Sequence, residues 1–274
     1  MLSSMSQITL GSADWNFWPI TRDYSQIFGY VRDLHIQSVE LGIYQPSQEL
    51  APRPLKELTE KAKSSNLQIT AVLFSLTSDL WGEGAFSNNK SRFLEEFKFF
   101  LTALETQGIK CANVWTGVDL VDSNPEEVAK TLTKMNLLAQ NFSGTVSIEY
   151  KEGTYFQDAQ TTLDLLQEFE NLKILLDTGH AYALNENPEN LVELLSKHEK
   201  LGSIHLGDAQ IGESDDDLPC GRIHNFGLFV EALENLHLPI VANFDLYGAA
   251  MDPLGPGPRS IVTESLRHLQ DCGL

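Results

Sequence analysis

Cysteine, positive charge and long apolar runs are all scarce in this sequence. Its 274 residues include three cysteines, and an odd count without close pairing suits neither a disulfide framework nor a cysteine-rich zinc cluster. Lys and Arg number 19 against 38 Asp and Glu, and the net charge of −19 disfavours nucleic acids and anionic membranes, whose phosphates it would repel. No run of about 18 apolar residues is present, so no membrane-spanning helix is predicted.

The first residues also lack the features of a secretory signal. MLSSMSQITL contains neither a basic segment nor a long apolar one. Together with the unpaired cysteines, this predicts a reducing, cytoplasmic location. No low-complexity stretch, long linker or change of composition divides the chain, and we expect residues 1–274 to form one domain.

Short apolar runs alternate with amphipathic helical segments along the whole chain, which predicts consecutive βα units and a parallel sheet. Asn124-Pro125 and Asn187-Pro188 are typical helix starts, since Asn can cap a helix and Pro suits its first turn. A closing helix is expected over 259–269. The eight predicted strands lie near 7–11, 38–42, 68–74, 110–115, 145–150, 173–177, 202–206 and 239–244.

Eight such units can form an open sheet or a closed barrel, and the strand faces favour the barrel. In several strands apolar and polar residues alternate, so one face meets the helices and the other faces a lumen. This alternation directs Glu149, His205 and Asn243 into the lumen. Polar residues at the carboxyl ends of several strands are typical of an active (β/α)8 barrel. We therefore predict an α/β fold, a single-domain (β/α)8 TIM barrel.

Three consecutive strand ends carry groups that can bind metal: Glu149, Asp177 and His205, with His180 three residues after Asp177. Alone, such a glutamate more often forms a salt bridge, and such a histidine is more often structural. Together they favour a mixed oxygen and nitrogen site for a divalent metal ion such as Mn, Zn, Co or Mg. A cation there would act as a Lewis acid.

The segments Val-Ser-Ile-Glu-Tyr (146–150), Leu-Asp-Thr-Gly-His (176–180) and Ile-His-Leu-Gly-Asp (204–208) resemble the xylose isomerase-like barrel superfamily. That group holds sugar isomerases and epimerases, inosose dehydratases and endonuclease IV-type enzymes. The resemblance implies that Glu149, Asp177 and His205 are metal ligands and that His180 contacts the substrate or supports the site. Lys151 resembles the lysine of a Glu-x-Lys arrangement that assists proton movement in xylose isomerase, although a surface lysine fits equally well.

One position departs from the family pattern, which usually places a glutamate on the eighth strand as fourth ligand and second base. Asn243 stands at that point; its carbonyl can coordinate a metal ion, but it cannot act as a base. Asp245 could substitute in part if the strand extends that far. With Glu149 as the single base, aldose–ketose isomerisation or dehydration is favoured over a two-base epimerisation.

Other residues are candidates for contact with the substrate. Arg222 and His224 follow the seventh strand in a loop that resembles the Pro- and Gly-rich loop of the family, although a solvated acidic turn explains much of its composition. Trp15, Trp81 and Trp115 lie near predicted strand ends, where their rings can pack against sugar C–H faces or belong to the core.

These features predict an enzyme of carbohydrate metabolism: a metal-dependent isomerase or epimerase of a small sugar, polyol or sugar phosphate. The alternatives are a polyol or inosose dehydratase and a carbohydrate-binding protein without activity. An endonuclease IV-like phosphodiesterase is disfavoured, because it needs further histidines on early strands, where Glu40, Gly42 and Phe74 stand instead. Families of this kind often form dimers, so a homodimer is one expected assembly.

Overall fold

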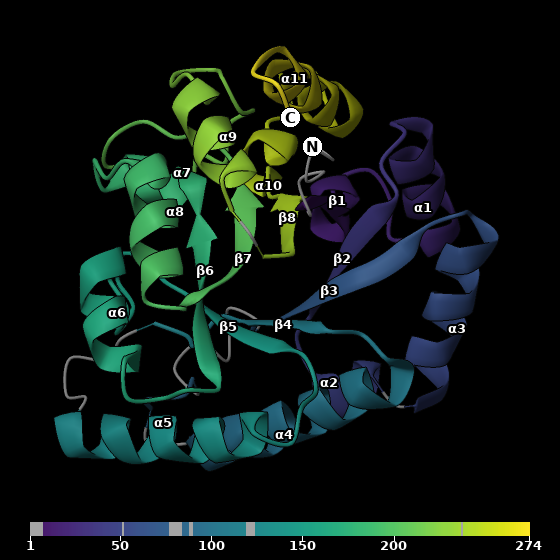
Figure 1. Ribbon diagram of the computed structural model, residues 1–274. Coiled ribbons are helices and arrows are strands. Elements are labelled where there is room, and N and C mark those ends of the chain that lie inside the picture. Colours follow the sequence, from purple (N-terminus) through teal and green to yellow (C-terminus); the bar gives the residue numbers. More distant parts are fainter. Residues whose placement is uncertain (1–7, 51, 77–83, 88–89, 119–123, 237) are drawn as a thin grey trace, which may run out of the picture.

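The computed structural model describes residues 8–50, 52–76, 84–87, 90–118, 124–236 and 238–274 (Figure 1). Trp81 lies outside these ranges. Eight parallel strands form a closed barrel in which each strand pairs with its neighbours in sequence and β1 pairs with β8. The strands are β1 (Ile8–Ala13), β2 (Ser38–Ile43), β3 (Gln68–Phe74), β4 (Cys111–Val114), β5 (Thr145–Glu149), β6 (Leu172–Asp177), β7 (Leu201–Leu206) and β8 (Ile240–Phe244).

Helices surround this barrel, as Figure 1 shows, and the predicted (β/α)8 fold is confirmed. All eight strands begin and end within one residue of their predicted positions, except that β1 ends two residues later than predicted. The helices are the 3-10 turn η1 (Asp14–Phe17), α1 (Tyr24–Asp33), α2 (Pro46–Glu49), α3 (Pro52–Ser64), α4 (Lys90–Gln107), α5 (Pro125–Ala139), α6 (Ala159–Leu166), α7 (Thr178–Ala183), α8 (Pro188–Lys197), α9 (Gly227–Glu234), α10 (Tyr247–Met251) and α11 (Pro258–Asp271).

The two predicted Asn-Pro helix starts differ in their capping. Asn124 accepts a hydrogen bond from the backbone N–H of Glu126 (2.9 Å) and so caps α5 through its side chain. Asn187 also precedes a helix, α8, but its side chain makes no capping hydrogen bond. The fixed backbone angle of Pro188 and the charge of Glu189 in the first turn remain as the local signals for that start.

The main core lies between the strands and the helices. The aromatic stripe of α4 illustrates it: Phe93 stacks on Phe74 of β3 with ring centroids 5.1 Å apart, and Phe97 and Phe100 are fully buried beside them. Phe74 is therefore a core residue that packs under α4. The lumen side of the barrel is different, because buried polar residues gather there, and these residues build the site at the strand ends.

Candidate active site

Glu149, Asp177 and His205 meet at the carboxyl ends of three adjacent strands, β5, β6 and β7. One ligand atom from each lies within 4.8 Å of the others. Nδ1 of His205 is 3.9 Å from Oε1 of Glu149 and 3.8 Å from Oδ2 of Asp177. The three residues are 6%, 3% and 0% exposed. The structure thus brings together the three residues that the sequence pointed to as metal ligands.

The Asp-Thr-Gly-His segment explains how Asp177 is aimed. Its Oδ1 accepts a hydrogen bond from the backbone N–H of His180 (2.9 Å) and caps α7, which leaves Oδ2 facing His205. Thr178 donates its hydroxyl to the carbonyl of Gly207 (2.6 Å) and thereby ties this turn to the end of β7. A Cβ atom at Gly179 would lie 3.2 Å from Oδ1 of Asp177, so a larger residue would crowd the cap.

His205 is held by one ring nitrogen and open at the other. Nε2 donates to Oε2 of Glu40 (3.0 Å), because a carboxylate can only accept. Nδ1 makes no hydrogen bond within the described structure, although it is fully buried and faces carboxylates. Burial lowers the pKa of His205, but the charges of Glu40 and Asp245 outweigh it and hold that pKa well above its ordinary value. A cation bound by the carboxylates would take the place of that proton.

Asp245 adds a further carboxylate to this group. The backbone N–H of Asp245 donates to the carbonyl of Leu206, so the pairing of β7 and β8 continues past the last residue of β8. Oδ2 of Asp245 lies 3.3 Å from Nδ1 of His205, and Oδ1 accepts from Nε1 of Trp15 (2.7 Å). A Cβ at Gly207 would come within 2.9 Å of the Asp245 carbonyl, so this close approach requires glycine.

Asn243 faces the lumen as predicted, but the structure directs its amide elsewhere. Its Nδ2 donates to Oε2 of Glu40 (2.7 Å). Of Asn243 and Asp245, which lie near the end of β8, it is Asp245 that approaches Nδ1 of His205. The physical reason is the height of the residues along the barrel: side chains two positions further along β8 reach the level at which the ends of β5 and β6 meet.

A pocket of 640 Å³ opens above this group at the mouth of the barrel. Burial raises the pKa of Glu149, which lies in its wall, although the nearby charges of His180 and His205 oppose this shift. The wall combines aromatic and acidic side chains. Its described residues are Trp15, Tyr44, Leu73, Ser75, Leu76, Trp115, Val118, Glu149, Lys151, Glu152, Gly153, Thr154, His180, Asp215, Asp217, Asp245 and Tyr247.

Lys151 and His180, for which the sequence predicted a catalytic role, both lie in the wall of this pocket. Nδ1 of His180 donates to the carbonyl of Tyr150 (3.0 Å), and the ring's other nitrogen is left to accept a hydrogen bond. The ammonium of Lys151 pairs with Asp215. Burial lowers the pKa of Lys151, but this pair and the charge of Glu149 raise it above its ordinary value, so the lysine is a cation.

Arg222 and His224 are not among the described residues of the pocket wall. The guanidinium of Arg222 forms a two-pronged pair with Glu264 on α11, with distances of 2.8 and 2.7 Å. His224 donates to Asp208 (2.7 Å) and stacks on Tyr182 with ring centroids 4.0 Å apart. These contacts hold the loop after β7 against α7 and α11. The expectation that they contact the substrate is therefore not supported by their placement.

Three residues for which the sequence predicted no role in the site belong to this region. Asp208 accepts from the backbone N–H of Ile223 and His224 and so fixes the loop after β7. Asp217 lies in the pocket wall, and burial together with the charges of Asp245 and Asp177 raises its pKa well above the ordinary value. Glu40 holds His205. Its inward position on β2 was the only signal in the sequence that could have identified it.

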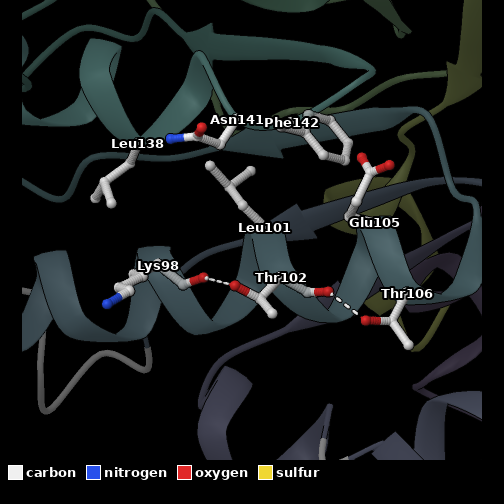
Figure 2. Close-up of a pocket in the computed structure, with 8 residues that line it drawn as sticks. All are labelled: Lys98, Leu101, Thr102, Glu105, Thr106, Leu138, Asn141 and Phe142. Carbon is white, nitrogen blue, oxygen red and sulfur yellow. Dashed lines mark hydrogen bonds between the residues drawn. The ribbon is translucent and has the colours of Figure 1, made fainter.

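A second hollow, of 250 Å³, lies outside the barrel. Figure 2 shows it between the α4 residues Lys98 to Thr106 and the segment from Leu138 to Phe142, which spans the end of α5 and the residues that follow it. This is the end of the barrel where β4 and β5 begin, opposite the mouth. Glu105, its one carboxylate, already accepts from the backbone N–H of Ser143 (2.8 Å). The hollow therefore offers no group of the kind found at the mouth.

Asp14 is a fully buried carboxyl group directly after β1, outside the metal-binding group. Its Oδ1 accepts from the backbone N–H of Gly42 (3.0 Å). Burial raises the pKa of Asp14 to about 7, and the charge of Glu40 adds to the shift. A carboxyl group whose pKa is raised on folding stabilises the fold below its unfolded pKa of 3.8, and this stability is lost as the pH rises through about 7.

Asp14→Asn is therefore expected to change the pH dependence of stability. Asparagine keeps an oxygen for Gly42 and stays neutral. The free energy of unfolding of the Asp14→Asn variant at pH 8 should exceed that of the wild type by roughly 1 to 4 kcal/mol, and the two should differ little near pH 4. Urea unfolding at the two pH values measures this, with the exposed Asp23→Asn as control. A difference that does not change with pH would contradict the assignment.

The family model of the xylose isomerase-like TIM barrel matches residues 28–272. The chain belongs to this family. No curated protein is significantly similar to the chain in sequence. Within the described ranges, every helix is too short or too polar to cross a membrane.

Three solved structures share the fold of this chain over nearly its whole length. D-allulose 3-epimerase from Methylomonas sp. superimposes with a TM-score of 0.78 at 15% identity, covering 98% of this chain and 99% of that one. 3-Keto-D-glucoside 4-epimerase YcjR from E. coli superimposes with a TM-score of 0.72 at 16% identity, covering 97% of this chain and 100% of that one. The IOLI protein with a bound zinc atom superimposes with a TM-score of 0.70 at 16% identity, covering 96% of this chain and 97% of that one. At such low identities the likeness concerns the fold.

Proposed function

We propose that this member of the xylose isomerase-like family is a divalent-metal-dependent isomerase or epimerase of a small sugar or polyol. The proposal rests on one observation: Glu149, Asp177 and Asp245 converge on Nδ1 of His205 beneath the mouth pocket. This nitrogen makes no hydrogen bond within the described structure. This donor set fits Mn, Zn, Co or Mg. A bound cation would act as a Lewis acid that polarises a carbonyl or hydroxyl oxygen. The similar structures, two epimerases and a protein with a bound zinc atom, support this choice.

Glu149 is the proposed base. Its carboxylate lies in the pocket wall and at the same time within the metal-binding group, so it would reach a carbon next to a carbonyl that a bound cation polarises. Removal of a proton from that carbon is the first step of isomerisation, of epimerisation and of dehydration next to a carbonyl. A positioned base of this kind contributes about 10²- to 10⁴-fold to the rate.

Asp245 changes the balance between these reactions. A two-base epimerisation needs a proton donor on the face opposite the base, and with Asn243 alone β8 offered none. β5 and β8 are three strands apart around the closed barrel, so Glu149 and Asp245 reach the pocket from different sides. Epimerisation is therefore as compatible with the site as isomerisation, and the preference for a single base no longer applies.

The remaining wall residues would position the substrate. Lys151 and His180 can bind substrate oxygens, the first as a donor and the second as an acceptor. Trp15 and Trp115 present aromatic surface on which sugar C–H faces pack. Trp15 has a second role, because its N–H holds Asp245.

Proton exchange with solvent tests this proposal directly. The chain, loaded with Mn²⁺ or Zn²⁺, is incubated in D₂O with a panel of ketoses, aldoses and inososes and followed by NMR and mass spectrometry. The proposal predicts deuterium at the carbon next to the carbonyl of at least one compound, together with its epimer or isomer. Sugars that bind without exchange would contradict the proposal and support a carbohydrate-binding protein. Loss of water without an isomeric product would identify a dehydratase.

A further inference from the structure

Glu40 is a fully buried carboxylate in the lumen, on β2, away from the substrate pocket. Three donors converge on it. Nε2 of His205 (3.0 Å) and Nδ2 of Asn243 (2.7 Å) bind Oε2, while Nδ2 of Asn113 (2.7 Å) binds Oε1. The donors come from β7, β8 and β4, so a single side chain joins four strands of the barrel beneath the site.

We infer that Glu40 is a positioning residue of the metal centre, and that Asn243 serves Glu40 and is not a metal ligand. This role rests on the proposed metal-dependent function. Glu40 accepts the Nε2 proton of His205, which fixes the ring so that Nδ1 faces Glu149, Asp177 and Asp245. A carboxylate partner of this kind sets the tautomer of a ligating histidine and makes the nitrogen that faces the metal a better ligand.

The hydrogen bonds around Glu40 require a group that only accepts. Asn113 is oriented by its Oδ1, which accepts from the hydroxyl of Ser203 (2.6 Å), so that its Nδ2 faces Glu40. His205 presents its Nε2 proton. A glutamine at position 40 would therefore oppose one of these donors with its own N–H group. The conflict is relieved if the His205 ring accepts at Nε2 and carries its proton on Nδ1, a tautomer that cannot bind metal at Nδ1.

The same geometry accounts for the asparagine on β8. His205 and Asn243 are partners in the register of β7 and β8, which brings both donors to the same oxygen of Glu40. A glutamate at position 243 would place a second buried carboxylate against Glu40, and like charges so close disfavour each other's ionised form. Asparagine supplies the missing donor, and Asp245 supplies the carboxylate at the level of the metal position.

Metal affinity measured by calorimetry on the full chain, with Mn²⁺ and separately with Zn²⁺ under competition by a chelator, tests this role. Glu40→Gln is expected to weaken binding by about 10- to 100-fold, the range typical for the hydrogen-bond partners of ligating histidines. Glu40→Asp, which keeps the charge, should recover part of the loss, and Asn243→Ala should cause a smaller loss. Asp158→Asn is the control, since this carboxylate caps α6 and is not part of the metal-binding group, and the metal affinity of this variant should stay at the wild-type level.

A spectroscopic readout separates positioning from a general loss of structure. In the zinc-loaded wild type, the Nε2 proton of His205 should give a downfield, slowly exchanging NMR signal, identified by its absence in His205→Gln. Glu40→Asp should retain this signal, and Glu40→Gln should lose it while other histidine signals persist. If Glu40→Gln does not fold, Asn243→Ala takes its place in the affinity test.

The outcomes distinguish the two proposals. A wild-type chain that binds neither metal overturns the metal-dependent function, and the role of Glu40 with it. A wild-type chain that binds metal, with unchanged affinity and an unchanged Nε2 signal in Glu40→Gln, overturns only the role of Glu40. If Asn243→Ala stands in for a variant that does not fold, unchanged affinity there overturns the inference in the same way.

Discussion

Asp177→Asn is expected to bind Mn²⁺ or Zn²⁺ more than about 100-fold more weakly than the wild type, a larger loss than the range typical for residues that only support a ligand. The substitution removes one anionic oxygen from a buried site, while Oδ1 still caps α7 by accepting from the backbone N–H of His180. Asparagine caps helices about as well as aspartate, so the stability of the metal-free chain should change little. Calorimetric titration and thermal unfolding measure the two quantities.

Asp158→Asn is the matched control for this change. Asp158 caps α6 by the same device, accepting from the backbone N–H of Thr161 (2.7 Å), and it is not part of the metal-binding group. Its metal affinity should equal that of the wild type. Equal affinity in Asp177→Asn as well would show that Asp177 serves only as a helix cap. Asp177→Ala should lose both functions, with an added cost of about 1 kcal/mol in stability.

Glu149→Gln is expected to lower the turnover rate of the identified substrate by about 10²- to 10⁴-fold, even at saturating metal. Glutamine can still offer an oxygen at the metal position, but it cannot accept the proton of the substrate carbon. Deuterium exchange from D₂O should fall by the same factor as turnover, since both depend on that proton. Steady-state kinetics at several metal concentrations separate the loss of the base from a loss of metal.

The exposed Glu193→Gln on α8 is a suitable control, with activity expected at the wild-type level. Full activity in Glu149→Gln at any metal concentration would remove Glu149 from the role of base. A loss that disappears at high metal would instead show that Glu149 acts only as a ligand. In that case Asp245, the other carboxylate of the pocket that lies close to His205, becomes the group to replace next.

The fold could be read from local patterns. The alternation of short apolar runs and amphipathic segments determined eight strand positions, and the closed barrel followed from the polar residues on one strand face. The Asp-Thr-Gly-His segment was equally informative, because its features are local: Asp177 caps the helix that begins at the next residue. Strand alternation also placed Glu149, His205 and Asn243 in the lumen, where the structure has them.

The heights of residues around the barrel could not be read in the same way. Alternation directs both Asn243 and Asp245 inward, but their level relative to β5 and β6 depends on the stagger of all eight strands. Likewise, Glu40 meets His205 and Asn243 across separations of 165 and 203 residues. The direction of Arg222 depends on how Asp208 closes the loop after β7 and on a partner in the last helix. These properties belong to the assembled barrel.

Metal content of the purified chain, measured by elemental analysis after exposure to Mn²⁺ or Zn²⁺ and removal of the excess, tests the metal centre most directly. The site of Glu149, Asp177, His205 and Asp245 predicts about one metal ion per chain in the wild type and much less in Asp177→Asn. A folded wild-type chain that retains no metal under these conditions, or an Asp177→Asn variant that retains as much as the wild type, would contradict it.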